Sequence, residues 1–238
     1  MKNALVTGGS GGIGAAICRR LSADGCHVYI HANRGLQAAQ TLADAICAGG
    51  GSAQVLAFDV TDSRAVADVL TPLVEHQPIQ ILVNNAGIHD DAVFPGMRAE
   101  QWHRVIDVSV NGFFVTQPLM MPMLRSRWGR IINVSSIAAL TGNRGQVNYS
   151  AAKGALNSAT KSLALEVASR GITVNAVAPG IIDTPMSESA FGAQDIARMV
   201  PMKRAGTPGE VADLIGFLAS TQAAYITGQI ISINGGIV

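Results

Sequence analysis

A tyrosine and a lysine lie four residues apart in the segment NYSAAK, at Tyr149 and Lys153, with only small residues between them. Residues four apart share one face of a helix, so a phenol and an ammonium would lie side by side there. A free phenol has a pKa of about 10, which is too high for efficient proton transfer at neutral pH, and a nearby ammonium lowers it. Such a pair is suited to acid/base chemistry, but taken alone this spacing more often belongs to a solvated helix face.

A glycine-rich segment, VTGGSGGIG, follows the first β-branched run of the chain and precedes a helical pattern. Glycines permit a tight turn and let backbone N–H groups approach a pyrophosphate, to which a helix N-terminus adds partial positive charge. The strand before and the helix after supply the context of a dinucleotide site, whereas a purely structural turn is the alternative. The expected contacts are Gly8, Ser10, Gly11, Gly12, Ile13 and Gly14.

The end of the second expected strand lacks the acidic residue that usually binds the ribose 2′-hydroxyl of NAD. No Asp or Glu occurs between Asp24 and Asp44, and Arg34 stands in this region beside Asn33. A guanidinium suits a phosphate better than a neutral diol, so the sequence favours NADPH. An ordinary solvated arginine is the alternative.

Two more polar segments follow expected strands, FDVTD and LVNNAG. Asp59 is suited to accept from an adenine amino group, or else Asp59, Thr61 or Asp62 caps the next helix. The paired amides that begin with Asn84 either line the cofactor site or join neighbouring strands. The expected cofactor contacts are Asp59, Val60, Asn85, Ala86 and Gly87.

Short β-branched runs alternate with longer helical patterns along the chain. The expected strands are residues 4–6, 28–30, 54–57, 79–83, 130–134, 173–178 and 229–233. Such alternation predicts one α/β domain over residues 1–238, a Rossmann-type doubly wound parallel sheet with helices on both faces. Ligands bind such sheets at the carboxyl ends of the strands, where each of these motifs falls.

The chain has 238 residues, 48% of them hydrophobic and 14% charged, and a formal net charge of +1. The balanced charge argues against a nucleic-acid-binding protein. No apolar run reaches the roughly 20 residues of a membrane helix, and the first strand leaves no room for a signal peptide, so we expect a cytoplasmic protein. Cys18, Cys26 and Cys47 lack CxxC spacing, so we expect reduced thiols and no metal site.

In order, the motifs TGGSGGIG, NNAG, INVSS, NYSAAK and VNAVAPG resemble those of the short-chain dehydrogenase/reductase family, over essentially the whole chain. Within it, the segments GQVNYSAAKGAL, SLALEVASRGITVNAVAPG and YITGQIISINGG are most similar to the 3-oxoacyl-[acyl-carrier-protein] reductases. The resemblance implies that Tyr149 is the acid/base, that Lys153 also binds the nicotinamide ribose, and that Ser136 orients the substrate carbonyl. It further implies cofactor contacts from Pro179, Gly180, Ile182 and Thr184.

Two positions depart from the family pattern. Ser109 occupies the position of an Asn that holds a relay water, and Asn111, two residues on, would point to another helix face. Ser109 can still hold a water by its hydroxyl. Gly11 stands where NADP-preferring relatives often have Arg, which weakens the case for NADPH.

The segment at about 183–208 is long enough for a lid over the substrate. Its Met186, Phe191, Met199 and Met202 either offer adaptable apolar surface or belong to the core. Arg127 and Arg170 match positions that relatives use to dock the acidic acyl carrier protein, and we expect them near the pocket entrance, unless they are merely solvated. The resemblance also implies a homotetramer, or a hetero-oligomer with a homologue.

These expectations favour NADPH-dependent reduction of a 3-oxoacyl thioester on acyl carrier protein. One alternative is a dehydrogenase of another small carbonyl or alcohol, such as a sugar, a polyol or an acyl-CoA, because one fold serves many substrates. Another is a weakly active partner subunit of an active homologue, for which Ser109 is the only support.

Overall fold

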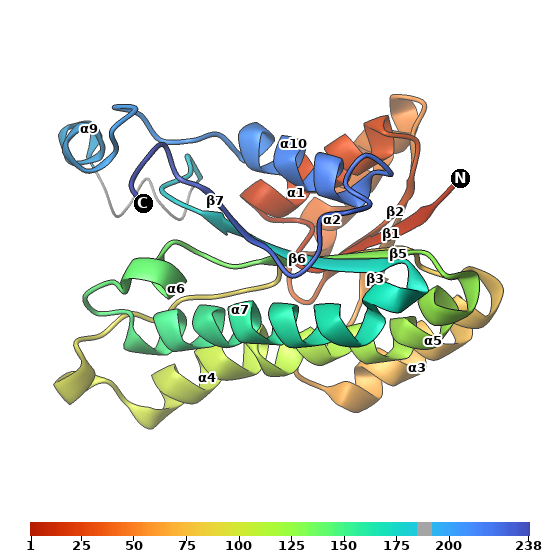
Figure 1. The fold of residues 1–238 in the computed structure, drawn as a ribbon, viewed down its shortest axis with the longest axis horizontal. Coiled ribbons are helices and arrows are strands. Elements are labelled where there is room, and N and C mark those ends of the chain that lie inside the picture. The colour runs from red at the N-terminus through yellow and green to blue at the C-terminus, as the bar shows by residue number, and fades with distance from the viewer. Residues whose placement is uncertain (185–191) are drawn as a thin grey trace.

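A twisted parallel sheet forms the centre of the molecule (Figure 1). The computed structural model describes residues 1–184 and 192–238, and within them the sheet has seven strands in the order β3-β2-β1-β4-β5-β6-β7. The strands are β1 Asn3–Val6, β2 His27–Ala32, β3 Ser52–Ala57, β4 Ile81–Asn84, β5 Gly129–Val134, β6 Ile172–Pro179 and β7 Ile230–Ile233. Each lies within two residues of an expected run, so the sheet confirms the doubly wound α/β architecture.

Helices cover both faces of the sheet, as Figure 1 shows. One face carries α1 Gly12–Ala23, α2 Leu36–Ala48 and α10 Pro208–Ala219. The other carries α3 Ser63–His76, α4 Ala99–Ser109, α5 Gln117–Ser126 and α7 Val147–Val167. The shorter segments are α6 Ala138–Thr141, α9 Ala193–Met199 and the 3₁₀ turns η1 Phe94–Gly96, η2 Asn111–Thr116 and η3 Ala168–Arg170.

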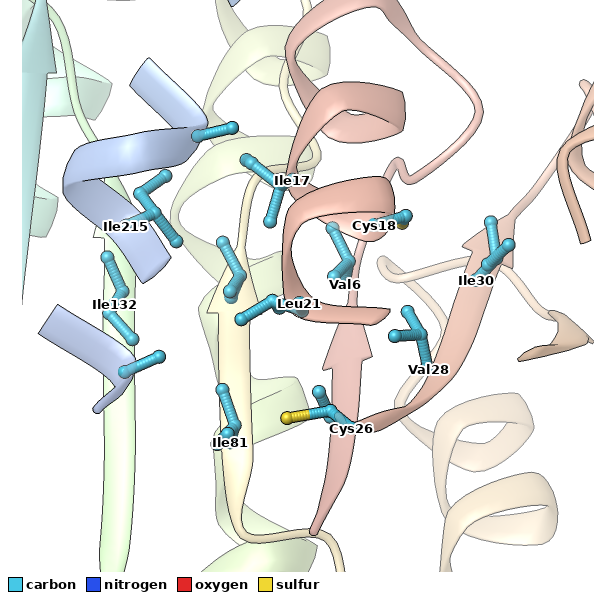
Figure 2. Close-up of a cluster of buried hydrophobic side chains, with 14 of the residues drawn as sticks. Val6, Ile17, Cys18, Leu21, Cys26, Val28, Ile30, Ile81, Ile132 and Ile215 are labelled. Atoms are coloured by element: carbon cyan, nitrogen blue, oxygen red, sulfur yellow. The ribbon is translucent and has the colours of Figure 1, made fainter. Parts of the chain in front are cut away.

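Each face of the sheet has its own hydrophobic core because successive side chains of a strand point to opposite faces. On β1, Ala4 and Val6 pack in the cluster beneath α1 and α10, and Leu5 packs in the cluster on the other face. Figure 2 shows the first cluster, in which Ile17 and Leu21 of α1 meet Val6 and Ile81. Burial on both faces explains why the strands read as continuous apolar runs.

All strands are parallel, so their carboxyl ends share one edge of the sheet. In Figure 1 this is the side of the molecule that carries α6 and α9, opposite the N-terminus. The turn before α1, the end of β4, the loop after β5 and the segment after β6 therefore meet there. No helix in the described residues is both long and apolar enough to cross a membrane.

Candidate active site

The turn between β1 and α1 is held in shape by the end of β4. Gly8 has a φ of +61°, a conformation that favours glycine. The side-chain amide of Asn85 donates hydrogen bonds of 3.0 Å to the carbonyl oxygens of Thr7 and Gly8. A Cβ at Gly14 would lie 2.3 Å from the Gly8 carbonyl oxygen, so the close approach of α1 to the turn requires glycine. These contacts fix the turn against the N-terminus of α1.

The N-terminus of α1 is open toward this turn. Gly11 is its N-cap and makes no side-chain capping bond, so the first amides of the helix have no side-chain partner at the cap. A Cβ at Gly11 would meet only the Gly8 carbonyl oxygen, at 3.7 Å. Ser10, Gly12 and Ile13 complete the segment. An uncapped helix N-terminus with open space beside it fits the pyrophosphate of a dinucleotide.

Hydrogen bonds join the ends of β2 and β3 beside the turn. The Asn33 amide donates to one carboxylate oxygen of Asp59 at 2.9 Å, and Thr61 donates to the other from its backbone N–H and its hydroxyl, at 2.9 and 2.8 Å. The bonds from Thr61, then that from Asn33 and the charge of Arg34, lower the pKa of Asp59. Asp62, not Asp59, caps α3, by accepting from two of its backbone amides.

The segment after β4 is joined to the end of β1. The hydroxyl of Thr7 accepts hydrogen bonds of 3.0 Å from the backbone N–H groups of Asn85 and Ala86. Asn84 is turned the other way, and its amide donates to Asn133 of β5 at 2.9 Å. The side chains of both asparagines thus join neighbouring segments, while the backbone that follows lies at the carboxyl edge. Val60 is buried near the end of β3.

The loop after β5 and the first turn of α7 bring Ser136 and Tyr149 together. The hydroxyl of Ser136 lies close enough to the phenol to act against the rise of its pKa. Ser136 also accepts a bond of 3.2 Å from the backbone N–H of Ala138. Asn148 is fully buried, and its amide donates to the carbonyl oxygens of Asp90 and Gln101 at 2.9 and 3.1 Å. These bonds fix the start of α7, and with it the position of the phenol.

Lys153 lies one turn further along α7, within the protein interior. Its side chain is 2% exposed, and its ammonium donates a hydrogen bond of 2.8 Å to the carbonyl oxygen of Val134, at the end of β5. The ammonium lies 5.7 Å from the centre of the Tyr149 ring. A Cβ at Gly87 would lie 3.1 Å from it, so the segment after β4 also contacts the lysine. Burial lowers the pKa of Lys153 to about 8.

The pKa of Tyr149 differs from the sequence-based expectation. The helix spacing predicts that Lys153 lowers it, but burial raises it, the hydroxyl of Ser136 opposes this rise, and the carboxylate of Asp91 adds to it. Desolvation disfavours the phenolate, and the ammonium is directed at Val134 rather than at the phenol oxygen. The phenol is therefore held in its protonated form.

Ser109 is the last residue of α4, where the chain passes into η2. Its side chain is 3% exposed, and its hydroxyl has no hydrogen-bond partner in the described part of the protein. The amide of Asn111 donates to Asp107 at 2.8 Å on the surface. Asn111 therefore does not supply the amide that position 109 lacks. The helix spacing predicted this, because residues two apart point to different faces.

The segment after β6 reaches from the loop that carries Ser136 to the glycine turn. The carbonyl oxygen of Pro179 accepts a 2.9 Å bond from the backbone N–H of Ile137, next to Ser136. A Cβ at Gly180 would lie 2.8 Å from the backbone of Asn234, after β7. Further on, Ile182 is buried. The methyl group of Thr184 would lie 3.1 Å from a Cβ at Gly12.

Part of the expected lid lies outside the described residues, including Met186 and Phe191. The described part contains α9 and the loop before α10. Met199 and Met202 are 41% and 63% exposed. In this chain they are therefore surface residues and not part of the core.

The two arginines expected to dock a carrier protein lie at the amino edge of the sheet. Arg127 precedes β5 and Arg170 precedes β6, whereas Ser136 follows β5. The six residues of β5 span about 20 Å. The guanidinium of Arg127 donates to the carbonyl oxygen of Ser169 at 3.0 Å. The expectation that both arginines line the entrance to the pocket of their own chain is therefore wrong.

Sequence reasoning missed Thr7 and Asn148 because their roles depend on contacts between segments distant in sequence. Thr7 stands directly before the glycines, and Asn148 directly before Tyr149. Both are buried polar side chains, which generally require partners. Each is the first residue of its motif, TGGSGGIG or NYSAAK, and this position was the available signal.

Comparison with known proteins agrees with this geometry. A family model described as Enoyl-(Acyl carrier protein) reductase matches residues 8–238. The chain is 44% identical to the 3-oxoacyl-[acyl-carrier-protein] reductase FabG of Aggregatibacter actinomycetemcomitans, over 98% of both proteins. It is 43% identical to the FabG protein of Escherichia coli (strain K12) and 41% identical to Nodulation protein G of Rhizobium sp. (strain N33), in each case over 99% of this chain and 96% of the relative.

These matches extend over the glycine turn, the Ser136–Tyr149–Lys153 cluster and the segment after β6. The matches with the relatives cover 98–99% of the chain. The chain therefore belongs to the short-chain dehydrogenase/reductase family, a family of oxidoreductases that use a nicotinamide cofactor.

Proposed function

We propose that this protein reduces a 3-oxoacyl thioester, carried on acyl carrier protein, to the 3-hydroxyacyl thioester with NADPH. The observation that carries the proposal is the convergence of Ser136, Tyr149 and Lys153 beside the glycine turn. Relatives named 3-oxoacyl-[acyl-carrier-protein] reductase match nearly the full chain at 41–44% identity.

The chemistry divides between the cofactor and the chain. The nicotinamide, when bound, supplies a hydride to the ketone carbon. Tyr149 donates the proton to the ketone oxygen, and the raised pKa of its phenol keeps that proton available in the reducing direction. The hydroxyl of Ser136 orients the same oxygen. Lys153 holds its charge beside the phenol and binds the nicotinamide ribose.

The remaining cofactor contacts follow the carboxyl edge. The pyrophosphate would lie against residues 8–14, the adenine against Asp59 and Val60, and the nicotinamide ribose near residues 85–87. Pro179, Gly180, Ile182 and Thr184 would cover the nicotinamide. The engaged carboxylate of Asp59 retains an acceptor for an adenine amino group because a carboxylate offers about four lone-pair sites and three are used.

The preference for NADPH rests on Arg34. It directly precedes Gly35, the N-cap of α2, which has no side-chain capping bond. A ribose 2′-phosphate would meet a guanidinium and an open helix N-terminus. A Cβ at Gly35 would lie 2.9 Å from the hydroxyl oxygen of Ser10, so that hydroxyl also reaches this place. No acidic residue stands between Asp24 and Asp44, at the end of β2, to bind a 2′-hydroxyl instead.

Ser109 would hold a water of the proton relay to Lys153. A buried hydroxyl without a protein partner is where an ordered water forms hydrogen bonds. The segment at about 183–208 would act as the lid, with Met199 and Met202 exposed toward a substrate acyl chain.

Docking of the carrier protein would use Arg127 and Arg170 of one chain at the pocket of another. The amino edge of one chain carries these arginines, whereas its own Ser136, Tyr149 and Lys153 lie toward the carboxyl end of β5. A carrier protein that touches both would therefore bridge two copies, which supports a homotetramer or another oligomer as the active form.

A spectrophotometric assay tests the proposal directly. The purified protein should oxidise NADPH when a 3-oxoacyl thioester is added, and the rate constant kcat/KM should be largest for the substrate on acyl carrier protein. A higher kcat/KM for acyl-CoA, or for a ketone without a thioester, would favour the alternative of a different small carbonyl substrate. No turnover with any of the three would contradict the proposal.

The second candidate function is a weakly active partner subunit of an active homologue. Ser109 in place of the usual Asn favours it, because a shorter side chain without the amide would leave the relay incomplete. Retention of Ser136, Tyr149 and Lys153 opposes it. Turnover by the isolated protein at a rate unchanged by a homologue would exclude it.

A further inference from the structure

The imidazole of His31, on β2, holds the backbone of the glycine turn. Its Nδ1 lies 3.0 Å from the backbone nitrogen of Gly8, and its Nε2 lies 2.9 Å from the carbonyl oxygen of Phe58, just after β3. The amide of Gly8 can only donate and the carbonyl can only accept. The ring is therefore neutral, with its hydrogen on Nε2.

Both backbone polar groups of Gly8, its N–H and its carbonyl oxygen, are held by hydrogen bonds. His31 accepts from its N–H, and Asn85 donates to its carbonyl oxygen at 3.0 Å. The carbonyl oxygen of His31 also accepts a 2.9 Å bond from the next amide, that of Gly9. These three bonds hold a residue whose left-handed φ of +61° begins the turn that leads into α1.

The surroundings of the imidazole favour its neutral form. His31 is 2% exposed, and its ring lies 4.1 Å, centre to centre, from that of Phe58. Burial lowers the pKa of His31, against the bond to Phe58 and the charge of Asp59, which raise it.

Asp59, after β3, is the charged group that acts on the ring. Tyr29, two residues earlier on β2, directs its hydroxyl to Gln77. Residues 7–14 and 84–87 are all uncharged. Protonation of His31 would place a hydrogen on Nδ1 against the Gly8 N–H, so the ring could no longer accept from it.

We propose that His31 is a positioning residue for the cofactor, whose neutral imidazole orients the Gly8 peptide and so preorganises the turn that receives the pyrophosphate. Protonation of the ring releases this peptide and weakens cofactor binding. The inference rests on the cofactor-binding role of the glycine turn and not on the identity of the substrate.

Calorimetric titration with NAD⁺ and NADP⁺ between pH 7 and pH 5, below the pKa of about 8 of Lys153, tests the proposal. NAD⁺ isolates the effect because a 2′-phosphate itself titrates, near pH 6 for a phosphate monoester. We expect the Kd for NAD⁺ to rise about tenfold over this range, the loss of one hydrogen bond. The rise should begin below the ordinary histidine value of 6.5, because burial lowers the pKa of His31.

Two leucine variants on β2 distinguish a role of His31 in positioning the glycine turn from a general loss of protein stability. His31→Leu removes the acceptor, so it should bind NAD⁺ about tenfold more weakly at pH 7 and lose the pH dependence. His27→Leu is the matched control: His27 hydrogen-bonds to Ser52 at 2.7 Å, far from the turn. It should keep the affinity and the pH dependence of the parent protein. A pH-independent Kd in the parent, or the same slope in His31→Leu, would overturn the inference.

Nuclear magnetic resonance of the parent protein provides the test if His31→Leu does not fold. With ¹⁵N-labelled histidine, His31 should be the neutral Nε2–H tautomer at pH 7, and its protonation should share one midpoint with the Gly8 amide shift and with the Kd. Different midpoints would contradict the proposal. Absence of any cofactor binding at pH 7 would overturn the proposed function as well, whereas pH-independent binding overturns this inference alone.

Discussion

The ammonium of Lys153 donates a hydrogen bond of 2.8 Å to the carbonyl oxygen of Val134, the last residue of β5. The lysine is thereby fixed to the strand that leads into Ser136, so the backbone sets the spacing between the ammonium and the loop that carries Ser136. The charge is also buried, with no carboxylate partner among the salt bridges of the described residues. Such an arrangement has a cost in stability that depends on pH.

The first prediction concerns that cost. Burial lowers the pKa of Lys153 from 10.5 to about 8, so the unfolded chain binds a proton more tightly than the folded one. Stability must then rise with pH between about 8 and about 10.5, and below pH 8 the full penalty, about 3 kcal/mol, is present. Lys153→Met should remove this pH dependence and raise the free energy of unfolding at pH 7, while abolishing turnover.

Denaturant unfolding at pH 7 and pH 10 measures this effect as the difference between parent and variant. Lys161→Met, on the exposed side of the same helix, is the control and should leave the dependence unchanged. A variant less stable than the parent at pH 7 would mean that the bond to Val134 outweighs desolvation.

The second prediction concerns proton donation. Tyr149→Phe keeps the ring but removes the proton that the raised pKa holds in place. A positioned acid typically contributes about 10²–10⁴-fold to rate, so kcat should fall by that order while the Kd for NADPH changes little. Steady-state assays and cofactor titration give the two quantities. Tyr225→Phe, at a fully exposed tyrosine, is the control. Near-normal turnover in Tyr149→Phe would remove the residue from the mechanism.

Some features of the fold and of the candidate active site were predictable from the sequence, and others were not. The seven strands and the turn before α1 follow from local patterns, because β-branched runs and a glycine cluster determine their own structure. Ser136, Tyr149 and Lys153 follow from motifs. The raised pKa of Tyr149 could not be predicted, because burial depends on how α7 packs against its neighbours. The spacing of Tyr149 and Lys153 in the sequence indicates only that an ammonium is near the phenol.

The position of Arg127 and Arg170, which were expected to dock a carrier protein, also could not be predicted from the sequence alone. Arg127 stands nine residues before Ser136 in the chain, which suggests that they lie close together. A strand extends by about 3.3 Å per residue, so neighbours in sequence lie at opposite edges of the sheet. The role of His31 likewise depends on the pairing of β2 with β1, which brings the imidazole beside Gly8.

The third prediction concerns cofactor choice. Arg34→Asp replaces the cation before α2 with a carboxylate that repels a 2′-phosphate and can accept from a 2′-hydroxyl. The kcat/KM with NADPH should fall, and the ratio of NADH to NADPH activity should rise by at least about tenfold, as expected for loss of about 1.4 kcal/mol. Arg64→Asp, an exposed arginine on α3, makes the same change of charge elsewhere. Parent enzyme that already prefers NADH would contradict the assignment.

The fourth prediction concerns Ser109, whose buried hydroxyl has no partner in the described residues. If it holds a relay water, Ser109→Ala should lower both turnover and stability, and Ser109→Asn should keep or raise turnover. If the hydroxyl is merely unsatisfied, Ser109→Ala should stabilise the protein by about 1–3 kcal/mol. Turnover and denaturant unfolding of the two variants distinguish these cases. Full activity together with higher stability in Ser109→Ala would exclude a relay through this position.

The last prediction concerns carrier-protein docking, and the control that it needs follows from the structure. Arg127 donates to the carbonyl oxygen of Ser169 and has a φ of +51°, so it also joins the corners before β5 and β6. Arg127→Glu combined with Arg170→Glu should raise the KM for a carrier-protein-bound substrate at least about tenfold, with little effect on a short soluble thioester. The difference should shrink as salt rises, since exposed charges are screened.

Arg125→Glu is the matched control, because it changes the charge at an exposed residue two positions away without touching Ser169. Docking at the amino edge of one chain can serve only the pocket of another, so the effect must also require an oligomer. Dilution to a concentration at which the protein is monomeric should therefore abolish the difference between the two substrates. Equal effects on the carrier-bound and the soluble substrate would mean that Arg127 and Arg170 support the fold, because a loss of stability does not distinguish substrates that share one pocket.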